Sequence, residues 1–180
     1  QHAVANDEKP SMVLRTGRNT SMRLSIEAVK EGKAFGVVSG GNTGALMALS
    51  KLVLRMLPGI SRPAIVSLFP TLKGEAVMLD MGANVECDAR DLFNFAVMGD
   101  AFARAVLGLS RPRIGILNIG SEEIKGHEVL HETATMLRRC DGRLEFRGFV
   151  EANHIPEGYA DVIVTDGFTG NVAIKMAEGT

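Results

Sequence analysis

Two short polar stretches, rich in glycine and carrying amide or hydroxyl side chains, are the parts of this chain best suited to chemistry. One is Asp166-Gly167-Phe168-Thr169-Gly170-Asn171, and the other is Ser39-Gly40-Gly41-Asn42-Thr43-Gly44. Each follows a short apolar run and precedes a helical pattern. Glycine lets the backbone approach a ligand closely, and the N–H groups and positive dipole end of a helix favour an anion. The two stretches therefore predict an anion site, for which phosphate is the usual ligand.

Two further polar turns follow apolar runs in the same way. They are Asp80-Met81-Gly82-Ala83-Asn84 and the longer stretch from Asn118 to Gly126. In an open α/β sheet, ligands bind at the carboxyl ends of the strands. We therefore expect all four turns to face one crevice.

The elements that must position these turns alternate along the chain. Short runs rich in Val and Ile alternate with longer segments of helical spacing, which is typical of βαβ units and a mainly parallel sheet. The predicted strands cover 34–38, 64–69, 76–80, 114–119, 144–150 and 161–165, and the predicted helices cover 21–30, 43–56, 92–107, 126–139 and 171 onward. The pattern predicts an α/β fold with a Rossmann-like layered sheet flanked by helices. The apolar helix 43–56 should be buried on more than one side, whereas helix 126–139 should be half exposed.

Composition excludes several classes of protein. The chain has 180 residues, 46% of them hydrophobic, and a formal net charge of −1, so it is globular and its charge does not favour nucleic acid. No run approaches the ~18 apolar residues of a spanning helix, and the first residues do not form a signal peptide. Cys87 and Cys140 are too few for a disulfide framework. We expect a cytoplasmic protein with reduced thiols.

In order and spacing, the four turns resemble those of the phosphate acyltransferase (PlsX) family of bacterial phospholipid synthesis. The resemblance is carried by Ser39 to Ala48, by Asp80 to Asn84 with Cys87, by Asn118-Ile119-Gly120 with Glu122, Glu123, Lys125 and Gly126, and by Thr165 to Val172 with Lys175, Glu178 and Gly179. It implies the formation of acyl phosphate from acyl-acyl carrier protein and inorganic phosphate, without a cofactor or metal. The fold would be related to phosphotransacetylases and isopropylmalate dehydrogenases. Family members are longer, so residues 1–180 are expected to be the central part of one catalytic protein that lacks its N- and C-terminal segments.

The resemblance and the chemistry together nominate site residues. The candidates for catalysis are Asn42, Lys125, Asp166, Asn171 and Lys175. The candidates for binding phosphate or substrate are Ser39, Gly40, Gly41, Thr43, Gly44, Asp80, Asn84, Asn118, Gly167 and Gly170. Amides, hydroxyls and glycine N–H groups would hold phosphate and the oxyanion formed on attack, lysines would neutralise charge, and Asp166 would orient a lysine or accept a proton. Phosphate is expected between the Ser39 to Gly44 and Asp166 to Asn171 turns, in a protein that forms homodimers; peripheral membrane association stays open.

Other interpretations compete with these. Asn84 and Asn118 are equally suited to closing turns, and Lys125 and Lys175 to lying in solvent. The sequence His127-Glu128-Val129-Leu130-His131 matches a zinc-peptidase pattern, but the apolar face of its helix and the lack of a third ligand argue against zinc. Alternative functions are a phosphotransacetylase-like acyl-CoA:phosphate transferase and a noncatalytic scaffold that binds acyl carrier protein. A nicotinamide dehydrogenase is disfavoured because no Gly-x-Gly-x-x-Gly turn is present.

Overall fold

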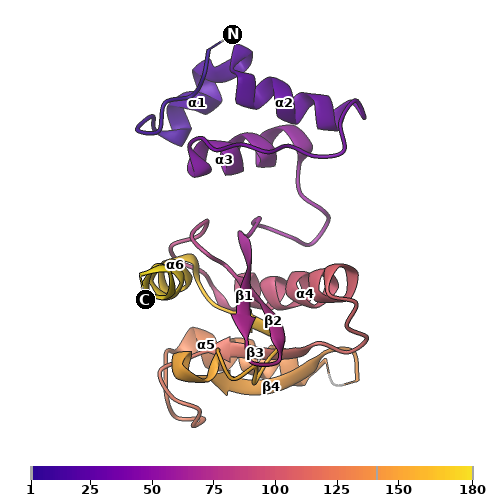
Figure 1. Cartoon of the computed structure of the whole chain (residues 1–180), viewed down its shortest axis with the longest axis vertical. Coiled ribbons are helices and arrows are strands. Elements are labelled where there is room, and N and C mark those ends of the chain that lie inside the picture. The colour runs from indigo at the N-terminus through magenta and orange to yellow at the C-terminus, as the bar shows by residue number, and fades with distance from the viewer. Residues whose placement is uncertain (1, 141, 180) are drawn as a thin grey trace. The chain divides into compact units, whose positions relative to one another are not determined.

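The computed structural model describes residues 2–140 and 142–179. The chain divides into two compact units, Gln1–Pro63 and Ala64–Thr180, whose elements are labelled in Figure 1. Each unit has its own hydrophobic core and is described here by itself.

The first unit is helical. It contains α1 (Pro10–Thr16), the short 3-10 helix η1 (Gly17–Asn19), α2 (Ser21–Lys30) and α3 (Thr43–Leu54). Helix α2 has the predicted bounds because the Thr20 side chain caps it, accepting a hydrogen bond from the Arg23 N–H at 3.3 Å. Helix α1 was not predicted, because this short helix of 7 residues buries only one side chain, that of Val13.

The core of the first unit is formed by side chains from all three helices. The buried members are Val4, Val13, Met22, Ile26, Ala45, Leu49 and Val53. Helix α3 contributes the last three as one stripe, while its Leu52 and Leu54 are exposed. The first unit alone therefore does not bury α3 on more than one side.

The predicted strand 34–38 is wrong. This segment is irregular in the structure, and Phe35 and Val38 are fully exposed, although Val37 packs against the core of the first unit. A strand requires a neighbouring strand to pair its N–H and C=O groups, and no described segment pairs with residues 34–38. The Val-rich sequence has the propensity for a strand but lacks the partner.

The second unit is built on a five-stranded sheet, which confirms the predicted α/β class. The strands are β1 (Val66–Thr71), β2 (Gly74–Leu79), β3 (Arg113–Leu117), β4 (Glu145–Val150) and β5 (Val162–Val164), in the order β1-β2-β5-β3-β4. Strand β1 forms an antiparallel hairpin with β2, and all other neighbours are parallel. Because the four parallel strands run the same way, their carboxyl ends lie along one edge of the sheet.

Helices cover both faces of this sheet. Helices α4 (Ala89–Val106) and α5 (Glu128–Arg138) pack on one face, and α6 (Gly167–Glu178) packs on the other through Ile174, so that α4 and α6 flank the strands in Figure 1. The 3-10 helix η2 (Ala152–His154) follows β4. Helix α5 is half exposed, as predicted, with Thr133, Ala134 and Leu137 buried.

Two helices begin earlier than the apolar pattern predicts. Helix α4 begins at Ala89 because Asp88 and Asp91 form a reciprocal capping box, and α6 begins at Gly167 because the Asp166 side chain caps it. Polar capping residues extend a helix beyond its first apolar residue. The Asp166 to Asn171 turn is therefore the cap and first turn of α6.

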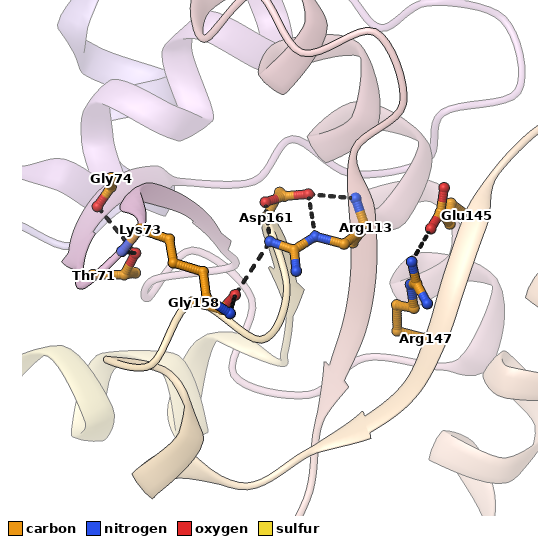
Figure 2. Close-up of polar contacts among 8 residues, drawn as sticks. All are labelled: Thr71, Lys73, Gly74, Arg113, Glu145, Arg147, Gly158 and Asp161. Carbon is orange, nitrogen blue, oxygen red and sulfur yellow. Dashed lines mark hydrogen bonds and ion pairs between the residues drawn. The ribbon is translucent and has the colours of Figure 1, made fainter.

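An ion pair braces the amino ends of the parallel strands, at the edge opposite the polar turns (Figure 2). Arg113, the first residue of β3, donates from Nε and Nη2 to the Asp161 carboxylate at 2.9 and 2.7 Å, and its backbone N–H donates to the same group at 2.8 Å. The Arg113 Nη2 and the Lys73 Nζ both donate to the Gly158 carbonyl, at 3.2 and 3.3 Å. Burial alone raises the pKa of Asp161, but the hydrogen bonds from Arg113 hold that pKa below its usual value.

Candidate functional site

The start of α6 lies against the Asp80 to Asn84 turn. The Gly167 N–H donates to the Asn84 carbonyl at 2.7 Å, which joins the two segments directly. The Asp166 carboxylate accepts hydrogen bonds from the Thr169 N–H and hydroxyl, each at 2.8 Å, and the Gly170 N–H donates to the Asp166 carbonyl at 2.9 Å. These backbone donors of the first turn are therefore already paired within the protein.

Steric contact explains the two glycines of this turn. A Cβ at Gly167 would lie 2.7 Å from the Asn84 carbonyl oxygen, and one at Gly170 would lie 2.0 Å from the Asp80 carbonyl oxygen. Only glycine permits so close an approach of the two backbones. The sequence predicted that these glycines let an anion approach the backbone. In the structure they let the backbone of the neighbouring turn approach it.

Asp80 organises that neighbouring turn. Its side chain is fully buried and accepts from the N–H groups of Ile65, Ala83 and Asn84 at 3.0, 3.0 and 2.7 Å, and from the Asn84 side-chain amide at 2.8 Å. Four donors on one carboxylate satisfy its acceptor capacity. Asp80 and Asn84 therefore hold the turn in shape.

The side chain of Asn171 lies beside this turn. It is half-buried, and its amide nitrogen would be 3.6 Å from a Cβ at Gly82, whose φ of 129° only glycine adopts readily. No hydrogen bond of this amide is found among the described residues. Of the two predicted catalytic asparagines, Asn171 is the one placed to donate to a ligand.

The Asn118 to Gly126 turn is tied together by its first residue. The Asn118 amide donates to the Lys125 carbonyl at 2.9 Å, and its oxygen accepts from the Ile119 N–H at 2.8 Å. A Cβ at Gly126 would lie 2.3 Å from that oxygen, which explains the glycine. The Lys125 side chain is exposed, as is that of Lys175 in the last turn of α6.

A cavity of about 700 Å³ opens among the carboxyl ends of β3, β4 and β5. Asn118 and Asp166 from the predicted site line it, whereas Lys125, Lys175 and Asn171 do not. The other lining residues were not among the predicted site residues, although some of them lie in the motifs quoted above. They are Leu117, Ile119, Gly126, His127, Leu130, Glu151, Ala152, Asn153, Thr165, Thr169, Val172, Ala173 and Met176. Thr169, Val172, Ala173 and Met176 have the spacing i, i+3, i+4, i+7, which places them on one face of α6, and this spacing could have indicated them from the sequence.

The two histidines of the zinc-peptidase pattern have different surroundings. His127 precedes α5 in an extended conformation and lines the cavity, so the helical i, i+4 relation does not apply to the pair. The His131 ring instead contacts Phe149 edge to face, with ring centroids 5.6 Å apart. Within residues 2–140 and 142–179, no three His, Cys, Asp or Glu side chains gather as a metal site would require. Cys87 is half-buried and packs against the core.

The Ser39 to Gly44 turn belongs to the first unit, where it ends at the start of α3. Asn42 is the cap of α3: its Oδ1 accepts from the Ala45 N–H at 2.9 Å, and its Nδ2 lies 3.3, 3.1 and 2.9 Å from the carbonyls of Ala5, Asn6 and Glu8. The Gly41 N–H donates to the Ser39 hydroxyl at 3.2 Å. Thr43 and Gly44 form the first turn of the helix, and Ser39 and Gly41 line a pocket of about 220 Å³ with Ser21 and Met22. Gly40 is exposed.

Three of the four predicted turns thus lie at one edge of one sheet, as expected. They bring together Asp80, Asn84, Asn118, Asp166, Gly167, Gly170 and Asn171. The Ser39 to Gly44 turn follows no strand, contrary to expectation. The sharing of one phosphate by that turn and the Asp166 to Asn171 turn stays a prediction.

No helix among the described residues is both long and apolar enough to cross a membrane.

Solved structures resemble this fold across most of the chain. The EutD phosphotransacetylase from Staphylococcus aureus matches with a TM-score of 0.69 and 19% identity, over 94% of this chain and 61% of that one. A branched-chain phosphotransacylase from Enterococcus faecalis V583 matches with a TM-score of 0.60 and 16% identity, over 87% of this chain and 63% of that one. At these identities the likeness establishes the fold alone.

Sequence relatives are much closer. The chain is 64% identical over 178 residues to a phosphate acyltransferase from Rhodospirillum centenum and 59% identical over 180 residues to one from Paramagnetospirillum magneticum. These alignments cover 99% and 100% of the chain and 50% and 51% of the relatives, so the chain spans about half the length of the curated relatives it matches. A family model described as "Fatty acid synthesis protein" matches residues 1–180. With a family model matched along its whole length and relatives this similar, the chain belongs to the fatty acid synthesis protein family that includes these phosphate acyltransferases.

Proposed function

We propose that this chain is part of an enzyme that transfers an acyl group from a thioester to inorganic phosphate. An oxygen of hydrogen phosphate attacks the thioester carbonyl, the C–S bond breaks, and the thiolate leaves with the proton that phosphate gives up. The products are acyl phosphate and a free thiol. The thioester is carried by acyl carrier protein, and no cofactor or metal is needed.

The observation that carries the proposal is the gathering of three polar turns at the carboxyl edge of one sheet, in a chain whose relatives are named phosphate acyltransferases. Such an edge is where α/β proteins bind small ligands. The same edge combines a cavity with amide side chains that can stabilise negative charge.

Asn171 is the proposed donor to the oxyanion. The backbone N–H groups of Gly167, Thr169 and Gly170 are paired within the protein, whereas no described residue bonds the Asn171 side-chain amide. Asp166 has two hydrogen bonds from Thr169, which hold its carboxylate at the mouth of the cavity. We assign it the orienting or proton-accepting role, with Lys125 and Lys175 as neutralising cations.

The enzyme acts in the cytoplasm as a homodimer, and it approaches the membrane only peripherally, to release its product to lipid synthesis. The family resemblance supports these points. The phosphate-binding residues of the first unit are Ser39, Gly40, Gly41, Thr43 and Gly44, with Asn42 holding their turn in place.

The test is an assay of the full-length protein with phosphate and acyl-acyl carrier protein, in which acyl phosphate is trapped with hydroxylamine. Acyl phosphate from the carrier-protein thioester supports the proposal. Product from the coenzyme A thioester alone would favour the phosphotransacetylase-like alternative, and carrier-protein binding without product would favour a scaffold.

The variant Asn171→Ala tests the proposed donor in the same assay. We expect turnover to fall by about 10²–10³-fold, the usual effect of losing one oxyanion donor, with an unchanged melting temperature. A lowered melting temperature with unchanged turnover would make Asn171 a structural residue.

A further inference from the structure

One stripe of α6 changes from polar to apolar along the helix. Thr169, Val172, Ala173 and Met176 all line the cavity, and their spacing places them on one helix face. From Thr169 to Met176 the helix rises by about 10 Å. The polar end of this stripe lies beside Asp166, which follows strand β5, and the apolar end lies toward the C-terminal end of α6.

Apolar side chains from two other elements also line the cavity. They are Leu117 and Ile119 at the end of β3 and Leu130 in α5. Several side chains of the cavity are exposed although they are apolar: Val172 is 56% exposed, Met176 72% and Ile119 81%. Exposed apolar side chains grouped around a hollow indicate a site that an apolar ligand covers.

The charged residues that line the cavity favour an uncharged group as its ligand. Its acidic lining residues are Glu151 and Asp166, and none of the described lining residues is lysine or arginine. Two carboxylates without a lysine or arginine among the lining residues disfavour an anionic group inside the cavity. The cavity volume of about 700 Å³ is within the usual range for small-molecule sites.

We propose that this cavity binds the hydrocarbon chain of the acyl substrate. The thioester lies just outside the polar end of the cavity, between Asp166 and Asn171, and only the chain enters it, running along α6 over Val172 and Ala173 to Met176. The proposal rests on the proposed function, because it takes the acyl group from that reaction. Beyond that function, the proposal states where the hydrocarbon chain binds and which residues limit its length.

The position of Ala173 sets the depth available to the chain. Ala173 is half-buried in the middle of the stripe, and it lines the same cavity as Leu130. A larger side chain there should fill part of the cavity. Ala177, on the same helix, is exposed and does not line the cavity, so it offers a matched control for the same substitution.

The experiment measures binding of n-alkyl phosphonates, from butyl to tetradecyl, to the full-length protein by calorimetry. Full burial of a methylene improves affinity about fourfold, and since the cavity is open on one side we expect about twofold per methylene. The gain should stop at a chain length that fills the cavity. In Ala173→Phe the gain should stop at a shorter chain, whereas Ala177→Phe should behave like the unchanged protein.

A second variant guards against a folding defect in Ala173→Phe. Met176→Ser changes an exposed side chain and should reduce the gain for the longer chains only. An affinity that is independent of chain length overturns the proposal, as does an equal effect of Ala173→Phe and Ala177→Phe. Either result would mean that the rest of the polypeptide or a second copy covers the cavity.

A second set of ligands distinguishes an error in the placement of the hydrocarbon chain from an error in the proposed reaction. Primary alcohols of the same lengths carry no phosphate, and the cavity should still give their affinities a chain-length dependence. Chain-length-dependent binding without acyl phosphate formation would refute the reaction but leave the cavity as a hydrocarbon site. Acyl phosphate formation with no dependence on chain length, in binding or in kcat/KM, would refute the cavity alone.

Discussion

Replacing Asn42 with alanine separates a structural from a catalytic role for this residue. The sequence analysis placed Asn42 among the catalytic residues, but in the structure both ends of its amide are already engaged. Its Oδ1 caps α3, and its Nδ2 lies within 3.3 Å of three carbonyls in the segment from Ala5 to Glu8. We therefore expect Asn42→Ala to lower stability and to leave turnover nearly unchanged at saturating phosphate.

The magnitude follows from the bonds that are lost. Removing an N-cap costs about 1 kcal/mol. The Nδ2 group has two hydrogens, so two of the three carbonyls can be bonded at once, at about 0.5–1.5 kcal/mol each. Because these bonds lie near the surface we take the lower value, and the sum is about 2 kcal/mol. For a protein of this size, that loss lowers the melting temperature by roughly 4–8 °C.

Asn42→Ser divides this total. Serine restores the cap on the Ala45 N–H but not the bonds to the carbonyls, so about half of the lost stability should return. The assays are thermal and urea unfolding of each variant, together with steady-state formation of acyl phosphate. A melting temperature that is unchanged in Asn42→Ala, with turnover reduced by about 10²–10³-fold, would refute this reasoning and restore Asn42 as an oxyanion donor.

Two further substitutions test the second unit. In Gly170→Ala the new Cβ would lie 2.0 Å from the Asp80 carbonyl oxygen. Overpacking should cost about 3 kcal/mol, and the better helix propensity of alanine should return about 1 kcal/mol, so we expect the free energy of unfolding to fall by about 2 kcal/mol. Urea unfolding measures this loss, with Gly179→Ala as the control. A Cβ at Gly179 would meet only ordinary contacts at 3.5 Å and beyond, so this variant should change stability by less than about 0.5 kcal/mol. Equal effects of the two substitutions would contradict the steric argument. Asp161→Asn should destabilise the protein at neutral pH, because Arg113 holds the pKa of Asp161 below its usual value of 3.8. A depressed pKa stabilises the fold above pH 3.8, and this contribution is lost as the pH falls through the folded-state pKa. The difference between variant and unchanged protein should therefore shrink in acid, and a constant difference would show that the ion pair does not cause it.

Local sequence was sufficient for the elements whose stability is local or whose burial is complete. The buried runs of β2, β3 and β5 were predicted to within two residues of their ends at each side, because a fully buried strand is a continuous apolar run. Helix α2 was predicted because a capping threonine precedes an amphipathic pattern. The carboxyl-edge position of three polar turns followed from the βαβ order alone.

Other features depended on partners distant in the sequence. The segment 34–38 has a strand-like sequence, but strand formation depends on a neighbour that supplies hydrogen bonds. The role of Gly170 likewise depends on the close approach of the Asp80 backbone, which lies ninety residues earlier in the chain. A contact between residues so far apart cannot be predicted from local sequence spacing. The same holds for Asn42, whose amide is engaged by the Ala5 to Glu8 segment.

The sequence by itself determined the α/β class, the mainly parallel sheet and the family resemblance, because alternating apolar runs and ordered polar turns are properties of the chain. Only the tertiary structure decided which polar groups have partners. It paired Asp80, Asn42 and the glycine N–H groups of α6 within the protein, and it set Thr169, Val172, Ala173 and Met176 against a cavity. The physical reason is that a donor or an apolar side chain acquires its role from what packs against it, and packing joins residues that are far apart in the chain.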